Sequence, residues 1–510
     1  CLKSERARSL GVTEEAVHTL QALSQACEAR AKVVCGFIYS SMLRDVDAAL
    51  VPLDYALESG EEIELRILYQ LRFLVDAAPL ELGSCGFVVP WLVQLVDQSR
   101  LGGDEAQDDR VVERLQLAVD TFAAHAVYGA DTAFPRAETV HALLVILRRM
   151  PMLVHDSVAA LRAFGEMISH THEGQYALIM QLLEACLSEE RRERDGALQC
   201  LVPLDLTELE FSPALWLAMH SDLAPLASQI WTENALDVPS TYVSSLVPLL
   251  RHAHAYVRTS AARAVGAACA LHPDTLGALL EALRMLYHAE NYSLAPEYDQ
   301  YGMVIESTLG REDPWHVRVA VARAIEASAP SFRAADVVPF FVFALQPGTA
   351  LSDRHEAVRH AMLEASSAVI DARGDDVLSE LLSQLEASLE SEHDAVTEAA
   401  VVLLGRAARY LPADSAHVRR VVERLLSALR TPSELVQEAV ASCLPALVRA
   451  SAAAKDVPSI VDRLFVDLLH GDKYATRRGA AYGLAGVVKG RGLSAIRELR
   501  ILARLSEAAH

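Results

Sequence analysis

Two pairs of histidines have a spacing that suits metal binding, with one residue between the two members of each pair. They are His170/His172 and His252/His254. Imidazole nitrogens are common zinc ligands, but a protein zinc site needs three or four ligands. Neither pair belongs to a His-Glu-x-x-His helix. Both pairs are expected at helix ends or turns, where solvated histidines are ordinary. We therefore predict no bound metal.

Adjacent carboxylates at Asp108/Asp109 and Asp375/Asp376 are the next groups that could do chemistry. Both pairs are expected in turns, where aspartate commonly caps a helix. The sequence has no Gly-x-x-x-x-Gly-Lys phosphate loop, no Gly-x-Gly-x-x-Gly turn and no Gly-x-Ser-x-Gly nucleophile elbow. We therefore predict that the protein is not an enzyme and needs no cofactor.

The eight cysteines are scattered, and no two of them form a Cys-x-x-Cys pair. This spacing argues against a structural zinc site and against a disulfide framework. Each cysteine is expected to be a small buried hydrophobe in a reducing compartment. They are Cys1, Cys27, Cys35, Cys85, Cys186, Cys200, Cys269 and Cys443.

Charge and hydropathy narrow the cellular setting. The 510 residues carry a formal net charge of −22, so the chain as a whole is not a nucleic-acid binder, and no DNA partner is expected. The longest apolar run, from Gly86 to Val96, contains a proline and is about half a membrane span. No charged-then-apolar leader opens the chain, and Cys1 stands first rather than Met, which suggests a piece of a longer protein. We predict a cytoplasmic protein without a membrane partner.

One segment departs from this acidic average. Residues 473–504 hold eight basic residues, and Glu498 is the single acid among the residues from Lys473 to Arg504. These charges either solvate polar helix faces or meet acidic neighbours in a further repeat, or they contact the phosphate backbone of RNA. The candidates for RNA contact are Lys473, Arg477, Arg478, Lys489 and Arg491.

A recurring pair of residues indicates which helices position these side chains. In each pair a β-branched residue stands just after a turn and is followed by a polar residue. The pairs are Val317-Arg318, Val358-Arg359, Val396-Thr397, Val436-Gln437 and Thr476-Arg477. Their spacings of 41, 38, 40 and 40 residues fall in the range of HEAT and armadillo repeats. Each valine is expected to open the buried stripe of the second helix of a hairpin, as in Val358, Met362, Ala365 and Val369.

A second recurring signal is a proline between apolar residues, which is expected near the start of the first helix of a hairpin. It occurs at Val51-Pro52-Leu53, Val89-Pro90-Trp91, Val247-Pro248-Leu249, Val338-Pro339-Phe340 and Val457-Pro458. Together the two signals predict an all-α fold, an α-solenoid in which about eleven HEAT hairpins form a right-handed superhelix. The predicted divisions are helices of a truncated repeat at 1–43, degenerate repeats at 44–271, a unit with an inserted loop (288–300) at 272–334, and regular repeats at 335–510.

Two longer stretches carry a family resemblance. The stretch from Asp472 to Gly490 and the stretch from Thr431 to Pro445 closely resemble neighbouring parts of the general-control translational activator, a giant HEAT-repeat protein of the amino-acid starvation response. Asp353 to Arg359 and Glu193 to Leu198 are similar in the same order. The resemblance implies a ribosome-associated scaffold that promotes activation of the initiation factor two alpha kinase on stalled ribosomes.

The resemblance also implies the partners. These are the ribosome, through its RNA or its proteins, and the initiation factor two alpha kinase, through regions that this chain lacks. The repeat period alone fits a second class of function equally well, a HEAT-array adaptor that binds another protein such as tubulin or a transport cargo. Only the two long stretches count against that alternative.

Overall fold

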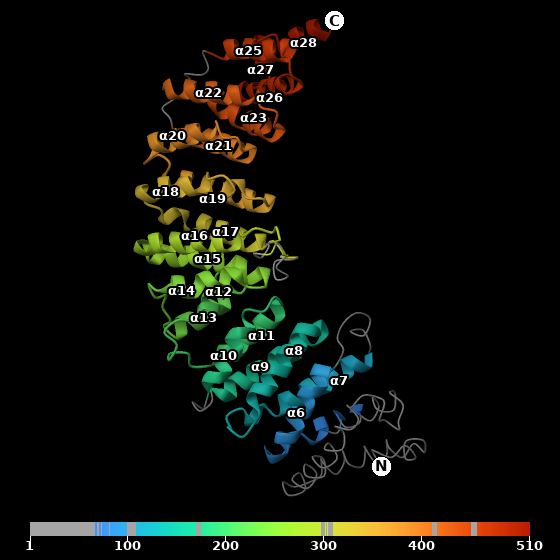
Figure 1. Cartoon of the computed structure of the whole chain (residues 1–510). Helices are drawn as coiled ribbons and strands as arrows, with labels where there is room; N and C mark the ends of the chain where they lie inside the picture. The colour runs from blue at the N-terminus through green and yellow to red at the C-terminus, as the bar shows by residue number, and fades with distance from the viewer. Residues whose placement is uncertain are drawn as a thin grey trace. The chain divides into compact units, whose positions relative to one another are not determined.

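The computed structural model of the chain describes residues 67–68, 71–72, 74–80, 82–98, 109–169, 175–296, 301, 303, 310–410, 416–449 and 456–509. Within these ranges the regular elements are helices, and no strand is present. Ten hairpins of two helices follow one another in the described ranges (Figure 1). The chain divides into two compact units, residues 1–237 with 254–260, and residues 238–253 with 261–510.

The first unit contains four described hairpins. These are α6 (Leu82–Gln98) with α7 (Asp109–Ala124), α8 (Arg136–Arg149) with α9 (Val154–Ile168), α10 (Gln175–Ala185) with α11 (Arg191–Leu201), and α12 (Pro213–Met219) with α13 (Ala224–Glu233).

The second unit continues the pattern with α14 to α28, except that the first six residues of α15 are counted with the first unit. Its hairpins are α14 (Tyr242–Leu246) with α15 (Ala255–Leu271), α16 (Leu276–Glu290) with α17 (Trp315–Ser328), α18 (Ala334–Ala344) with α19 (Glu356–Arg373), α20 (Leu378–Ser388) with α21 (Asp394–Ala407), α22 (Ala416–Ala428) with α23 (Glu434–Arg449), and α25 (Val457–His470) with α26 (Tyr474–Arg491). Two short helices follow, α27 (Ser494–Glu498) and α28 (Ile501–Ala509).

Short 3-10 turns interrupt or extend these helices. They are Ala126–Tyr128, Pro151–Leu153, Val247–Arg251, Pro273–Thr275, Ala329–Ser331, Ala350–Ser352 and Ala408–Tyr410. In Figure 1 the first helices α16, α18, α20 and α22 lie along one side of the second unit, and their partners α17, α19, α21 and α23 lie along the other. The predicted all-α HEAT-repeat solenoid is therefore confirmed.

The buried stripe predicted for the second helix of a hairpin is present in α19. Val358, Met362, Ala365 and Val369 all have no measurable solvent exposure. Their spacing of three to four residues places them on one face of the helix. Burial of each large apolar side chain contributes about 1.5–3 kcal/mol to the free energy of folding. The buried stripe, more than local helix propensity, therefore holds the hairpin in the stack.

In three of the five recurring pairs the polar residue has a role that the sequence did not reveal. Its side chain turns back to the carbonyl of the residue six positions earlier, in the turn that precedes the helix. Arg359 Nη1 donates to Asp353 O at 2.9 Å, Gln437 Nε2 to Thr431 O at 2.8 Å and Arg477 Nη1 to Gly471 O at 2.6 Å. Because a turn ends with carbonyls that no helix satisfies, these side chains fix the path from the first helix to the second.

The proline signal marks the first helices, but its predicted place near the helix start is wrong for three of the four described prolines. Pro248 lies in the 3-10 turn Val247–Arg251 after α14, and Pro52 lies outside the described residues. Pro458 does lie in the first turn of α25, whereas Pro90 and Pro339 lie inside α6 and α18. An interior proline removes one helical hydrogen bond and favours a kink. The neighbours Val89 and Trp91 are 2% and 4% exposed, so tertiary packing outweighs the local penalty in α6.

Glycines in α26 allow it to lie close against α23. Gly483, Gly486 and Gly490 recur at helical spacing, and Gly479 continues the same stripe. A Cβ added at Gly486 would lie 2.8 Å from Ala441 O, and one added at Gly490 would lie 2.9 Å from Pro445 Cα. These distances are shorter than real Cβ contacts, so only glycine fits at this separation.

Candidate nucleic-acid interface

The structure gives no support to a metal site. Among the described residues no three His, Cys, Asp or Glu side chains gather as metal ligands would. His254 Nδ1 lies 3.3 Å from Glu189 Oε2, which is an ordinary surface pairing. His170 and His172 lie outside the described residues. Asp109 is the first residue of α7, where a carboxylate favours the helix N-terminus, and Asp376 pairs with Arg373 in a turn.

The described cysteines are free thiols. Cys85, Cys186, Cys200 and Cys269 are buried, and Cys443 is half-buried. Burial raises the pKa of the Cys85, Cys186 and Cys200 thiols to about 12. These three thiols therefore stay protonated and unreactive, as expected of small core side chains. Along the part of the chain that the structure describes, no helix is long and apolar enough to cross a membrane.

The five residues predicted to contact RNA do not form one patch. Lys473 precedes α26, Arg477 and Arg478 lie in its first turns, and Lys489 and Arg491 lie in its last turn. The helix has 18 residues and is therefore about 27 Å long. The two groups of charges therefore lie at opposite ends of one helix, although all five belong to one short segment of the sequence.

At the N-terminal end of α26, the side chain of Arg478 is hydrogen-bonded to α23 of the neighbouring hairpin. Its side chain is 22% exposed, Nε donates to Gln437 Oε1 at 2.9 Å and Nη1 donates to Glu434 Oε2 at 3.0 Å. Hydrogen bonds from the Tyr482 hydroxyl to Glu434 and Glu438 raise the pKa of Tyr482 to about 12. Arg478, one of the candidates for RNA contact, therefore already has partners within the fold, whereas Lys473 is exposed.

At the other end of α26 the basic side chains are exposed and unpaired. Lys489 and Arg491 are followed by Arg497 in α27 and by Arg500 just after it. None of these four side chains has a hydrogen-bond or ion-pair partner among the residues that the structure describes. Arg504 differs, because its Nη1 donates to Asp462 Oδ1 at 2.8 Å and its guanidinium lies 4.0 Å from the centre of the Phe465 ring.

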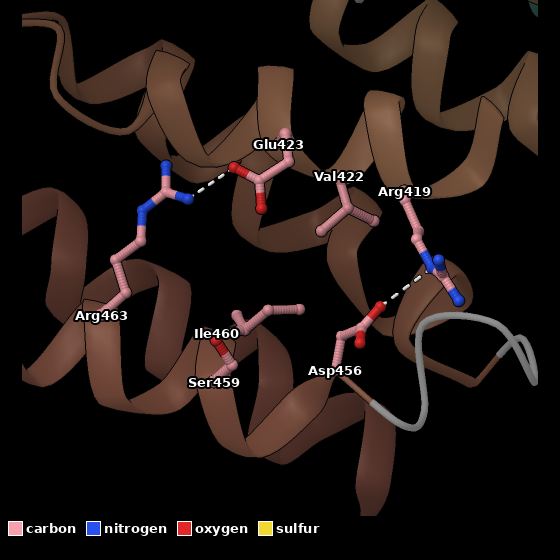
Figure 2. A pocket seen from close by; sticks show the side chains of 7 residues that line it. All are labelled: Arg419, Val422, Glu423, Asp456, Ser459, Ile460 and Arg463. Atoms are coloured by element: carbon pink, nitrogen blue, oxygen red, sulfur yellow. Dashed lines mark hydrogen bonds and ion pairs between the residues drawn. The ribbon is translucent and has the colours of Figure 1, made fainter. Parts of the chain in front are cut away.

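A cleft of about 310 Å³ separates the first helices α22 and α25 (Figure 2). An ion pair spans it near each end: Arg419 Nε lies 3.1 Å from Asp456 Oδ2, and Arg463 Nη1 lies 2.5 Å from Glu423 Oε2. Val422, Ile460 and Ser459 lie between the two pairs. Because these charges already neutralise each other, the cleft has no set of converging groups that could hold a cofactor or perform catalysis.

A buried charge network ties the end of α16 to the residues just before α17 and α19. Arg318 and Asp353 have no solvent exposure, and Arg318 also donates to Asp313 Oδ1 at 2.7 Å and to the carbonyl of Glu290 at 2.9 Å. Arg354 reaches the other side of Asp313 at 2.7 Å. Hydrogen bonds from Arg354 and Arg318 hold the pKa of Asp313 well below its usual range.

The backbone at this place is anchored on both sides. Helix α16 continues to Glu290, and residues 291–296 form no helix. The Tyr292 hydroxyl donates to Glu312 O at 3.0 Å, and Arg354 Nη1 donates to Tyr292 O at 2.7 Å. This network serves structure, since its polar groups satisfy one another and none is left for a ligand.

Two family models match the sequence. The model for HEAT repeats of the stalled ribosome sensor GCN1 matches residues 205–409, and the model for fungal GCN1-like HEAT repeats matches residues 31–148. Among curated proteins, the mouse protein named stalled ribosome sensor GCN1 is 30% identical over 463 residues, which are 85% of this chain and 17% of the mouse protein. The Saccharomyces cerevisiae protein named eIF-2-alpha kinase activator GCN1 is 29% identical over 522 residues, which are 98% of this chain and 19% of the yeast protein.

A crystal structure of importin beta has a TM-score of 0.33 and 14% sequence identity to this chain, and the match covers 99% of this chain and 70% of importin beta. The GCN1 matches extend far beyond the two stretches from which the resemblance was drawn. The chain spans between 11% and 19% of the length of the curated relatives.

Proposed function

Because the chain belongs to the GCN1 family of HEAT-repeat proteins, we propose that it is part of a non-catalytic scaffold that binds the ribosome. The whole protein would promote activation of the eIF-2-alpha kinase on stalled ribosomes during amino-acid starvation, and it would act in the cytoplasm. The observation that carries the proposal is the match of GCN1 HEAT-repeat models to residues 205–409 and 31–148.

The two-layer architecture supports this proposal. In a stack of hairpins each repeat contacts mainly its neighbours, so partner contacts can be distributed over a long surface. No metal cluster is present among the described residues, and the charges that line the α22–α25 cleft pair with each other. A partner surface is therefore the function that the geometry favours.

The partner of this section of the scaffold is proposed to be the ribosome, through ribosomal RNA or ribosomal proteins. Of the five residues predicted to contact RNA, Lys473, Lys489 and Arg491 are exposed and without a partner among the described residues. Contact with the kinase is assigned to regions outside this chain, so no residue described above is proposed to bind it.

Sedimentation of the purified 510-residue chain with ribosomes across a salt series tests the proposal. We expect co-sedimentation at low salt that declines steeply as salt rises, because contacts with RNA phosphates release counterions. A second test removes this region from the full-length protein and measures phosphorylation of initiation factor two alpha during starvation, which should fall. A chain that never co-sediments, together with normal phosphorylation and normal protein level after the deletion, would refute the proposed function.

A further inference from the structure

We propose that, within the second unit, the hairpin of α25 and α26 tilts on the hairpin of α22 and α23, and that exposed ion pairs form a salt-sensitive clasp that holds the cleft between α22 and α25 closed. The clasp consists of the ion pairs Arg419–Asp456, Glu423–Arg463 and Arg430–Asp467. The axis of the tilt is the contact between α23 and α26. The inference goes beyond ribosome binding and does not depend on it.

The two hairpins meet in two layers, and in one of them the contact is close. Gly486 of α26 faces the carbonyl oxygen of Ala441, and Gly490 faces Pro445, so no side chain separates α26 from α23 at these places. Leu444 of α23 and Val487 of α26 have no solvent exposure. Small shear movements between packed helices of this kind are a common form of conformational change. The α23–α26 contact can therefore persist while the hairpins change their angle.

In the other layer the contact is open. A cleft of about 310 Å³ lies between α22 and α25 (Figure 2), which is room enough for several water molecules. Its apolar lining is confined to Val422 and Ile460, which are 3% and 6% exposed. Since the hydrophobic cost of a movement scales with the apolar area that it exposes, a small tilt that widens this cleft costs little.

Charged side chains join α22 to α25 across this open layer. Two of the ion pairs span the cleft near its ends (Figure 2). In the third, Arg430 Nη2 lies 3.1 Å from Asp467 Oδ1. The more exposed side chain of each pair is between 51% and 61% exposed, so solvent and salt screen the attraction. The closure of the cleft therefore depends on ionic strength.

The weakness of each exposed pair makes the clasp adjustable. Loss of one such pair raises the ratio of open to closed molecules by about 1.4-fold to 5-fold. All three pairs oppose the same movement, so their combined loss raises the ratio by about 3-fold to 100-fold. Proteins populate minor conformations at about 0.1–10%, and a shift of this size makes such a conformation measurable.

A tilt at this junction changes the direction in which the following elements point. The curvature of a stack of hairpins is the sum of small rotations between neighbours. Rotation of α25 and α26 therefore redirects α27 and α28, which follow α26 in the chain. The second unit thus has one junction at which ionic strength adjusts the surface that it presents.

The test measures one distance in each layer of the 510-residue chain. Spin labels at Ser427 and Val466 report the separation of α22 and α25, and labels at Ala446 and Ala485 report the separation of α23 and α26. All four side chains are exposed and none belongs to the clasp. The labels are attached through non-natural amino acids, because the native cysteines would react with a thiol-directed label.

Two variants weaken the clasp without changing the net charge. One carries Glu423→Gln and Arg463→Gln, and the other adds Arg419→Gln and Asp456→Asn. Both are measured from low salt to about 1 M, where the Debye length falls to about 3 Å. Thermal unfolding checks that each variant is folded.

The matched control removes an ion pair of the same kind at the preceding junction. It carries Glu390→Gln and Arg424→Gln, whose parent side chains are 70% and 47% exposed and lie 3.1 Å apart. This control also keeps the net charge, so it separates the clasp from the general effect of losing an exposed ion pair.

We expect the distance between the labels at Ser427 and Val466 to shift to longer values as salt rises, and to be longer already at low salt in the clasp variants. The open-to-closed ratio should rise by about 1.4-fold to 5-fold for each pair removed. The distance between the labels at Ala446 and Ala485 should stay constant, and the control should match the parent chain at every salt concentration.

Three results would overturn the inference. The first is a distance between Ser427 and Val466 that responds neither to salt nor to the clasp variants. The second is an equal lengthening in the control. The third is lengthening of both distances, which would mean that the hairpins separate instead of tilting. Should a clasp variant fail to fold, the salt series on the parent chain decides by the same criteria.

Discussion

Arg318 and Asp353, which are 35 residues apart in the sequence, form a two-point ion pair that has no solvent exposure on either side. Arg318 Nε lies 2.7 Å from Asp353 Oδ2, and Nη2 lies 2.9 Å from Oδ1. Burial alone would lower the pKa of Arg318, but the hydrogen bonds that it donates to Asp353 and Asp313 raise the pKa above its ordinary value. The arginine is therefore charged in the core and depends on these two carboxylates.

Removal of Asp353 is predicted to be one of the most damaging single changes in the second unit. Asp353→Ala leaves the Arg318 charge buried with one fewer partner, and such a change costs about 3–5 kcal/mol. Urea unfolding and hydrogen exchange of the segments around residues 287–359 measure the loss. The control is Arg354→Ala, whose side chain is 33% exposed and whose loss should stay near 1 kcal/mol or below. Equal losses for the two changes would contradict the role assigned to the buried pair.

His125 is predicted to make the first unit sensitive to mild acid. Its Nε2 accepts from the backbone N–H of Leu80 at 2.9 Å, and its Nδ1 lies 2.6 Å from Thr121 O, to which it donates. Burial lowers the pKa of His125, so the folded state favours neutral imidazole. The unfolded chain binds a proton more readily, near its ordinary pKa of about 6.5. The stabilisation is present above that pH and is lost as the pH falls towards the lower pKa of the folded state.

Thermal unfolding at a series of pH values from about 8 to 5 measures this dependence. His125→Gln should unfold at a lower temperature than the parent at neutral pH, and the difference between the two should shrink as the pH falls. A difference that stays constant over the whole range would show that His125 does not titrate on unfolding.

A Gly→Ala substitution is predicted to have opposite effects on stability in the glycine stripe of α26 and in α6. In Gly479→Ala the new methyl group would collide with the carbonyl oxygen of Leu429, and the overpacking should cost about 1–3 kcal/mol. In Gly86→Ala, on the exposed face of α6, the methyl group meets nothing within 4 Å. That change should stabilise its helix by about 0.5–1 kcal/mol. Urea unfolding of both variants checks the prediction, and destabilisation by Gly86→Ala would be the contrary result.

The ion pair between Glu423 and Arg463 across the α22–α25 cleft should be weak. Their side chains are 59% and 36% exposed, so solvent and salt screen the attraction. A double-mutant cycle with Glu423→Gln and Arg463→Gln should give a coupling free energy of about 0.2–1 kcal/mol that vanishes in high salt. A larger coupling that persists in high salt would mean that the pair is less hydrated than its exposure indicates.

The repeat register was the part of the fold that the sequence predicted best. A buried valine such as Val358 and the polar residue after it recur because the second helix of each hairpin packs against its neighbours in the same way. The positions of Pro90 and Pro339 were misjudged, because the rule that places proline in a first turn is local, whereas both prolines sit in helices held by tertiary packing. The partners of Arg318 could not be foreseen, since Asp353 reaches it from a hairpin 35 residues away.

The candidate interface was predicted less well than the fold. Composition identified the basic segment. Whether each of its basic side chains is exposed and unpaired depends on which acidic residues the fold brings close to it. Arg478 meets Glu434, which is 44 residues away, whereas Arg497 meets no acid among the described residues. An amphipathic projection of α26 could have revealed that Arg478 is four residues from Tyr482 on the face towards α23. Nothing local could have shown that Glu434 lies opposite both.

The anchoring of Tyr292 to Glu312 and to Arg354 has a consequence for how this protein can change over evolution and in the laboratory. Since the chain leaves and rejoins the stack at one fixed place, the number of residues between these anchors is free to vary without shifting the register of the helices on either side. Loop-closure entropy grows only slowly with length, by about 0.6 kcal/mol for each doubling. Orthologues should therefore accumulate insertions and deletions here, and a peptide tag or fluorescent domain placed between the anchors should leave the hairpin stack intact.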